Sequence, residues 1–193
     1  MKVFWILVVF IWIKWGLIIA EENNNKNRKS SESEVFKPDE RNDEIHIPKD
    51  YDPRKEYPFI LNLHGYGSNG KGQLMFFPMK KLAEKYGFIF CAPDGIEKRW
   101  NATDACCDWK NEVDDSKYLR NLILKAMKAY NIDKKRVFVM GLSNGGFMSY
   151  RMAHDHSDLI TGIVPFAGVG FTQWPNTPEN PVSILHIHGT KDR

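Results

Sequence analysis

The sequence predicts an α/β fold, in which a mainly parallel β-sheet is covered by helices on both faces. Short apolar runs of strand length alternate along the chain with segments whose apolar residues recur at helical spacing. The runs at 58–63 and 88–92 are almost continuously apolar, which is typical of strands buried on both faces. The chain has 193 residues, 42% hydrophobic and 26% charged, so it can form one globular domain with a core.

The elements are predicted in order from local signals. Pro48 ends the first strand, as at a sheet edge. Pro78 stands in the first turn of the first helix and Gly87 stops it, while Asp114 or Asp115 caps the second helix. The predicted strands are residues 44–48, 58–63, 88–92, 137–140, 160–166 and 182–188, and the predicted helices cover about 77–86, 115–130 and 145–155.

The N-terminal segment is predicted to be a targeting signal. Lys2 precedes an apolar core at 3–13, and Ala20 suits the residue before cleavage, so residues 1–20 are interpreted as a signal peptide and the protein as secreted. A retained membrane anchor at 3–20 is the alternative, since the run is long enough to span a bilayer. Residues 21–42 form a polar low-complexity linker, and the folded domain is expected over 43–193.

Charge and cysteine content exclude some classes of partner. The formal charge is +3, from 27 basic and 24 acidic residues, without a basic stripe, so we expect no nucleic-acid partner. Cys91 lies in an apolar strand, whereas Cys106 and Cys107 are adjacent in a polar loop. Adjacent cysteines rarely bond to each other, so the pairing stays open. No second Cys/His pair has the spacing of a metal site, and no metal is expected.

The strongest chemical motif is Gly141-Leu-Ser143-Asn144-Gly145. It lies between an apolar strand and a helix, which is the context of a nucleophile elbow. The sharp turn holds Ser143 above the sheet, and both glycines are needed because a Cβ there would clash. The backbone N–H of Asn144 then points to the place where an oxyanion would form. The alternative is an ordinary glycine-rich turn with a surface serine.

A second glycine-rich loop, His64-Gly-Tyr66-Gly-Ser-Asn-Gly70, directly follows the buried strand at 58–63. Such a loop frees backbone N–H groups for a ligand, and we assign the second oxyanion donor to the N–H of Tyr66. The alternative is a plain turn with a structural His64. A phosphate-binding loop is disfavoured, because no Lys-Ser/Thr follows the glycines.

The long loop at 96–111 carries Trp100, Asn101 and Trp109, and its length and aromatic content suit a substrate-facing loop. The alternative is that the two tryptophans only anchor the loop on the body of the domain. In a parallel sheet, ligands bind at the carboxyl ends of the strands, so Ser143, the His64 loop and Asp192 are expected to converge at one edge.

Several of these motifs together resemble the secreted polyhydroxybutyrate depolymerase and feruloyl esterase family of α/β hydrolases. The resemblance covers about 45–192 and rests on six short motifs: Leu63-His-Gly-Tyr-Gly67, Trp100-Asn101, Cys106-Cys107, Val113-Asp-Asp115, Gly141-Leu-Ser-Asn-Gly-Gly146 and His188-Gly-Thr-Lys-Asp192. It implies an α/β-hydrolase fold with Ser143 as nucleophile, Asp192 as triad acid, and Tyr66 and Asn144 as backbone oxyanion donors. The family's triad continues with a histidine after the acid, yet all six histidines precede Asp192. We therefore expect the catalytic histidine beyond residue 193 and an incomplete, inactive domain.

The resulting hypothesis is an exported serine esterase without metal or organic cofactor. Its partner would be an ester substrate, either polymeric or small, such as a feruloyl or acetyl ester of a plant polysaccharide or a polyhydroxyalkanoate-type polyester. A membrane would be a partner only if the N-terminal segment is retained. A serine peptidase of the same fold and a non-catalytic hydrolase-like binding module are the alternatives.

Overall fold

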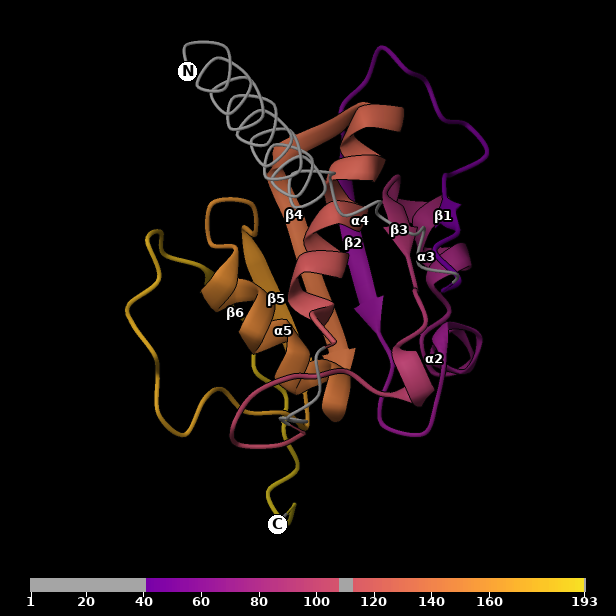
Figure 1. The fold of residues 1–193 in the computed structure, drawn as a ribbon. Helices are drawn as coiled ribbons and strands as arrows, with labels where there is room; N and C mark the ends of the chain where they lie inside the picture. Colours follow the sequence, from indigo (N-terminus) through magenta and orange to yellow (C-terminus); the bar gives the residue numbers. More distant parts are fainter. Residues whose placement is uncertain (1–40, 108–112, 193) are drawn as a thin grey trace, which may run out of the picture. The chain divides into compact units, whose positions relative to one another are not determined.

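The computed structural model describes residues 41–107 and 113–192. The predicted signal segment, most of the linker and Trp109 lie outside these residues. The described chain forms a six-stranded sheet (Figure 1) in the order β1-β3-β2-β4-β5-β6. The strands are β1 (Ile45–His46), β2 (Tyr57–Leu63), β3 (Ile89–Cys91), β4 (Ile132–Leu142), β5 (Gly162–Phe166) and β6 (Ser183–Ile184). The helices are α2 (Gly70–Phe76), α3 (Met79–Tyr86), α4 (Asp115–Ala129) and α5 (Asn144–Asp155), with a short 3-10 helix, η1 (Ile96–Lys98).

The sheet is mainly parallel, as predicted. β3, β2, β4, β5 and β6 pair in parallel, and only β1 joins β3 antiparallel at the edge. β4 is longer than predicted, because its first half, 132–136, reaches back to pair with Tyr57.

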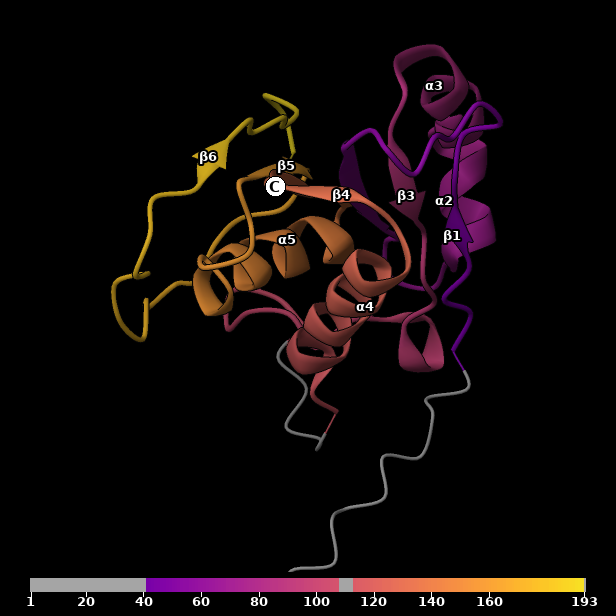
Figure 2. The ribbon, with the colours of Figure 1, turned by 90° about the horizontal axis from the view of Figure 1, so that it is seen from above.

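The side chains of β2 divide between two apolar layers. Phe59 and Leu61 pack with the buried faces of α4 and α5, whereas Ile60 packs with Met79 and Ala83 of α3 on the other face. Figure 2 shows α4 and α5 side by side, away from α2 and α3. The prediction that helices cover both faces is therefore confirmed.

The helical region before β3 differs from the predicted single helix at 77–86. It contains two helices, and the first, α2, begins at Gly70, where the Asn69 side chain accepts a hydrogen bond from the N–H of Gly72. This helix was not predicted, because the glycines at 70 and 72 have low helix propensity. Pro78 caps α3, because a proline needs no backbone donor at a helix start.

The last strand is shorter than the predicted 182–188. β6 spans two residues, but the parallel pairing with β5 continues through the N–H groups of Leu185 and Ile187, which donate to Ile163 and Pro165. β6 is the terminal strand of the described sheet, and the side chains of Ile184 and Leu185 are 54% and 60% exposed.

Candidate active site

Ser143 lies between the end of β4 and the start of α5, in a backbone conformation that few non-glycine residues adopt. Its φ is 50° and its ψ is −116°. This conformation costs of order 1–3 kcal/mol and persists only where the surrounding structure imposes it. Here the N–H of Ser143 donates to the carbonyl of Phe166 at 2.8 Å, and the residue is exposed. The strained, exposed serine on a strand-turn-helix is the geometry of a nucleophile elbow.

The two glycines of this turn are required by close backbone approaches. A Cβ on Gly141 would lie 2.2 Å from the carbonyl oxygen of Gly145. A Cβ on Gly145 would lie 2.3 Å from the carbonyl oxygen of Leu63. The second approach presses the first turn of α5 against the end of β2, where the glycine-rich loop begins.

The glycine-rich loop lies next to the elbow. A Cβ on Gly65 would come within 3.2 Å of the Leu142 carbonyl oxygen and 3.7 Å of the Ser143 Cβ. Tyr66 follows directly, with its side chain 61% exposed, and Gly67 has a φ of 77°. The structure therefore brings together the two segments from which the sequence analysis drew its oxyanion donors. Asn144 is the first residue of α5, where a backbone N–H has no acceptor within the helix.

His64 is a structural residue. Its ring is fully buried, Nε2 accepts the N–H of Gly95 at 2.8 Å, and Nδ1 therefore carries the hydrogen that it donates to the carbonyl of Gly65, also at 2.8 Å. Burial lowers the pKa of His64 below its ordinary value of 6.5, which keeps the ring neutral. The His64 ring is therefore structural, whereas the role of the loop's backbone N–H groups stays a prediction.

The substrate-facing prediction is wrong for Trp100. Its side chain is 0% exposed, stacks at 4.9 Å on the His64 ring, and donates from Nε1 to the His64 carbonyl at 3.0 Å. Asn101 is 9% exposed, and its Nδ2 donates to the carbonyl of Val113. Burying an indole N–H costs less free energy when the group donates a hydrogen bond. Trp100 therefore anchors the loop instead of lining a substrate surface.

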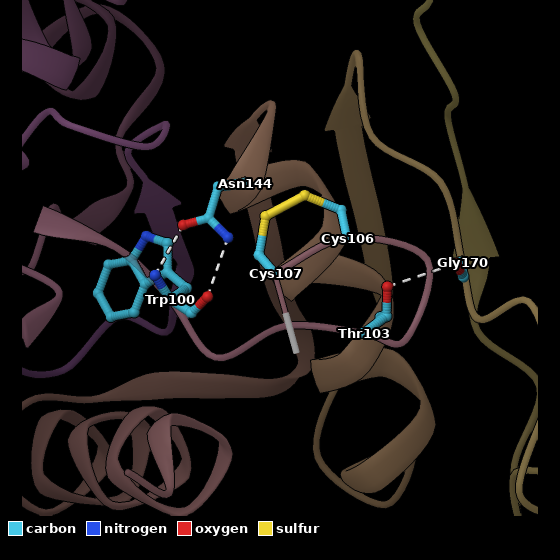
Figure 3. The surroundings of a disulfide bond; sticks show 6 residues. All are labelled: Trp100, Thr103, Cys106, Cys107, Asn144 and Gly170. Atoms are coloured by element: carbon cyan, nitrogen blue, oxygen red, sulfur yellow. Dashed lines mark hydrogen bonds between the residues drawn. A yellow bond between two sulfur atoms is a disulfide. The ribbon is translucent and has the colours of Figure 1, made fainter. Parts of the chain in front are cut away.

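Asn144 contributes a side-chain contact that the sequence analysis missed. Its Oδ1 accepts the backbone N–H of Trp100 at 2.6 Å, and its Nδ2 donates to the Trp100 carbonyl at 2.9 Å. Both bonds are drawn in Figure 3, which shows the amide group aligned with the Trp100 backbone. Asn144 is fully buried. The sequence signal for this contact was the asparagine directly after the serine of the motif, because a side-chain amide offers a donor and an acceptor in one plane and can pair with a backbone segment.

Cys106 and Cys107 are joined by a disulfide (Figure 3), which resolves the pairing that the sequence left open, although adjacent cysteines rarely bond to each other. Cys107 adopts a φ of 68°. The loop that contains the disulfide contacts the loop after β5, where Thr103 Oγ1 donates to the carbonyl of Gly170 at 3.5 Å. Cys91 is a buried thiol, and burial raises its pKa.

The predicted aspartate caps at the start of α4 divide into two roles. Asp114 is the N-cap, because its side chain accepts the N–H of Lys117 at 2.9 Å. Asp115 is 1% exposed and instead binds Arg41 and the N–H of Asn101. The second role joins the N-terminal edge of the described domain to the long loop.

The carboxyl ends of β4, β5 and the β6 segment are in register. Leu142 pairs with Phe166, and Phe166 forms a bridge with Ile187, so Ser143 and His188 each follow the paired row by one residue. Asp192 lies four residues further on, and its Oδ2 is 3.2 Å from Nε2 of His188. Asp192 is therefore placed past the same edge as Ser143, with a histidine that precedes it as its partner.

All six histidines are among the described residues, and each contacts a group other than Ser143. His46 stacks on Phe90, and His64 bonds Gly65 and Gly95. The other partners are Asp155 and the Asn176 carbonyl for His154, Ser116 for His156, the Tyr150 hydroxyl for His186, and Asp192 for His188. Within residues 41–107 and 113–192 the structure thus shows no histidine hydrogen-bonded to Ser143.

Two further properties concern only the described part of the chain. No group of three or more His, Cys, Asp or Glu side chains in it has the arrangement of a metal site. No helix in it combines the length and apolar character needed to cross a bilayer.

Comparison with known families gives the decisive observation, because residues 51–193 match the phospholipase/carboxylesterase family of α/β hydrolases. The chain belongs to this family. The match includes the elbow, the glycine-rich loop and Asp192, and it confirms the α/β-hydrolase fold that the motifs implied.

Curated relatives of this α/β hydrolase are esterases. The chain is 28% identical over 154 residues to a bifunctional acetylxylan esterase/xylanase of Neocallimastix patriciarum, covering 77% of this chain and 21% of that protein. It is 28% identical over 155 residues to a probable feruloyl esterase C of Aspergillus terreus, covering 77% and 53%. The chain thus spans about half, or less, of the length of these relatives.

A solved structure shares the fold of this α/β hydrolase. The acetyl xylan esterase of Aspergillus awamori superposes with a TM-score of 0.56 at 24% identity, covering 65% of this chain and 46% of that one. At this identity the likeness concerns the fold alone.

Proposed function

We propose that this α/β hydrolase is a serine esterase that cleaves carboxylic esters through an acyl-enzyme on Ser143. The observation that carries the proposal is the strained conformation of Ser143, next to a glycine-rich loop at the carboxyl edge of a parallel sheet. Strained residues of this kind cluster at functional sites, and a nucleophile that must stand above the sheet requires this conformation.

The proposed reaction has two steps. Ser143 Oγ attacks the ester carbonyl carbon while a histidine base takes its proton, and the oxyanion accepts hydrogen bonds from the N–H groups of Tyr66 and Asn144. Collapse of this intermediate releases the alcohol, which receives the proton, and leaves an ester on Ser143. Water then attacks the acyl group while the same base takes its proton, and the base returns that proton to Ser143 Oγ as the carboxylic acid leaves.

The proposed substrate is an acetyl or feruloyl ester of a polysaccharide, by analogy with the esterase relatives, and a polyester is the alternative. Asp192 is proposed to orient the base, because it lies past the strand edge that holds Ser143. No cofactor is required, since each step uses only proton transfer and acyl transfer.

The test is hydrolysis of p-nitrophenyl acetate, methyl ferulate, acetylated xylan, a hydroxybutyrate oligomer and a peptide anilide by the full-length protein. We expect turnover of at least one ester and its loss in Ser143→Ala. Preference for the anilide would favour a serine peptidase. Unchanged ester turnover in Ser143→Ala would refute the acyl-enzyme.

A non-catalytic binding module is the second candidate, favoured by the observation that each of the six histidines contacts a group other than Ser143. The two candidates differ in the reactivity of Ser143. An esterase reacts with a fluorophosphonate probe at Ser143, whereas a binding module leaves the serine unlabelled but retains affinity for the ester.

Export is proposed from residues 1–20, because a basic residue, an apolar core and a small residue follow one another as in a signal peptide. N-terminal sequencing of the protein from the culture medium should give a start near Glu21. A protein that starts at Met1 and sediments with membranes would show an anchor instead.

A further inference from the structure

The two proposed oxyanion donors are 78 residues apart in sequence, and one short segment contacts the loops that carry both. We propose that residues 95–100, the bridging segment, fix the N–H groups of Tyr66 and Asn144 relative to each other. In this proposal the Asn144 side chain and the Trp100 indole are positioning residues for the oxyanion site. The inference rests on the proposed function and deepens it.

The bridging segment is attached to the elbow by the side chain of Asn144. Oδ1 accepts from the Trp100 N–H at 2.6 Å and Nδ2 donates to the Trp100 carbonyl at 2.9 Å (Figure 3). The amide thus pairs with the Trp100 backbone as a neighbouring strand would. Both residues are 0% exposed, so water does not compete for these bonds. Because the Asn144 N–H is the proposed donor, its own side chain fixes the residue that donates.

The bridging segment is attached to the glycine-rich loop by three further hydrogen bonds. Trp100 Nε1 donates to the His64 carbonyl at 3.0 Å, and the Gly95 N–H donates to His64 Nε2 at 2.8 Å. The carbonyl of Lys98 accepts the N–H of Gly67 at 2.8 Å. These bonds flank Tyr66 on both sides, at residues 64 and 67, so they restrict the direction of the intervening N–H.

Backbone strain in the bridging segment supports this role. Glu97 and Lys98 have φ values of 50° and 60°, although neither is a glycine. Such conformations are costly and persist where other contacts impose them. The carbonyl of Lys98, in the second strained residue, is the one that accepts from Gly67. The strain therefore coincides with the contact to the oxyanion loop.

The physical consequence is a rigid separation between two donors that arise on different strands. A hydrogen bond to an oxyanion depends strongly on distance, and a displacement of about 1 Å can lower a rate about 100-fold. Apart from the bridging segment, the loop after β2 and the elbow after β4 meet through Leu63, which pairs with Gly141 and lies against Gly145, and through Gly65, which lies against Leu142. Loss of the Asn144 amide should therefore affect kcat more than KM, because the oxyanion forms only in the transition state.

The test compares Asn144→Leu and Asn144→Asp with a matched control, Gln73→Leu, in the full-length protein. Gln73 of α2 also has a buried side-chain amide and lies outside the bridging segment. Its Nε2 donates to Asn62 Oδ1 at 2.8 Å. Each of the three variants removes at least one hydrogen bond of a buried side-chain amide and should lower the midpoint of urea unfolding. We expect kcat for an aryl ester to fall about 100-fold in both Asn144 variants, with KM within about 3-fold, and to change by less than about 3-fold in Gln73→Leu.

Trp100→Phe adds an independent variant, because it keeps an aromatic ring but removes the Nε1–H. We expect an intermediate fall in kcat. Asn144→Leu with kcat within about 3-fold of the parent, or equal losses in Asn144→Leu and Gln73→Leu, would overturn the positioning role.

Hydrogen exchange separates this inference from the proposed function. Amide exchange in residues 64–67 should accelerate in Asn144→Leu beyond any change in β2, and should not do so in Gln73→Leu. Unchanged exchange at 64–67 in Asn144→Leu would refute the bridging role whether or not the protein is an esterase. Failure of the parent to hydrolyse any ester, with the exchange pattern as expected, would refute only the esterase proposal.

Discussion

Arg41 and Asp115 form a buried ion pair across 74 residues of sequence, with Nη1 of the guanidinium 2.5 Å from Oδ1 of the carboxylate. The side chains are 8% and 1% exposed. The guanidinium also lies 3.4 Å from the centroid of the Tyr118 ring, and Oδ2 of Asp115 accepts the N–H of Asn101. The pair therefore links the first described residue to α4 and to the loop that follows the bridging segment.

Breaking this pair should destabilise the domain much more than breaking an exposed pair of equal length. Asp115→Ala leaves a buried guanidinium without its partner, which costs about 3–5 kcal/mol. The control is Asp43→Ala, which removes the pair between Asp43 and Lys125, also 2.5 Å long but 37% and 60% exposed, and should cost less than about 1 kcal/mol. Urea unfolding measures both. Equal losses would show that burial does not control the strength of the Arg41–Asp115 pair.

The close approach of α5 to β2 gives a second stability prediction. Gly145→Ala would place a methyl group 2.3 Å from the carbonyl oxygen of Leu63, and neither can rotate away, because the methyl position is set by the α5 backbone and the carbonyl belongs to β2. We expect a loss of about 3 kcal/mol or more in the free energy of unfolding, together with loss of serine reactivity. Gly189→Ala is the control, because its nearest contact would be an ordinary 3.7 Å. An unaltered Gly145→Ala protein would contradict the described elbow.

Three histidines predict a loss of stability at mildly acidic pH. Burial lowers the pKa values of His46, His64 and His156 from the ordinary 6.5. A lowered pKa in the folded state means that the unfolded state binds more protons below pH 6.5, so stability is present above that pH and is lost as pH falls toward the folded-state values.

The measurement is the free energy of unfolding between pH 7 and pH 5, above the range where carboxylates titrate. Each buried histidine can contribute a slope of at most about 1.4 kcal/mol per pH unit. Because His64 is fully buried, His64→Gln should reduce the slope. A flat profile in the parent, or an unchanged slope in His64→Gln, would show that the pKa of His64 is not lowered in the folded protein.

The exposed terminal strand predicts self-association of the 193-residue chain. Ile184, Leu185 and Ile187 are 54%, 60% and 42% exposed beside an edge that the described residues leave unpaired. Such an edge can pair with another chain. Light scattering should show oligomers that Leu185→Lys reduces, because a charge on an edge strand opposes pairing. Monomers at micromolar concentration would contradict this prediction.

The same chain should react poorly at Ser143. With each histidine occupied by another partner, the hydroxyl keeps its ordinary reactivity, and only the oxyanion site and binding remain, worth about 10³- to 10⁴-fold over water. We expect no measurable esterase turnover and no rapid fluorophosphonate labelling of the purified 193-residue chain. Ordinary turnover would show that one of the six histidines moves to serve as the base.

The sequence alone determined the features that depend on local chemistry. The elbow could be predicted because Gly141 and Gly145 flank a serine between a strand run and a helix run. The parallel sheet could be predicted because continuous apolar strands alternate with amphipathic helices. The Asp114 cap followed from its position before a periodic apolar stripe.

The tertiary structure decided what depends on partners distant in sequence. From the sequence, Trp100 could be either a substrate contact or an anchor. Its hydrogen bonds with the His64 carbonyl and the Asn144 amide in the folded chain make it an anchor. Asp115 resembles a cap until Arg41 approaches from 74 residues away. The helix at 70–76 was hidden by two glycines whose poor propensity is offset by the Asn69 cap. Local sequence fixes which elements form, whereas the bonds of a buried polar group depend on which chain segments the sheet brings together.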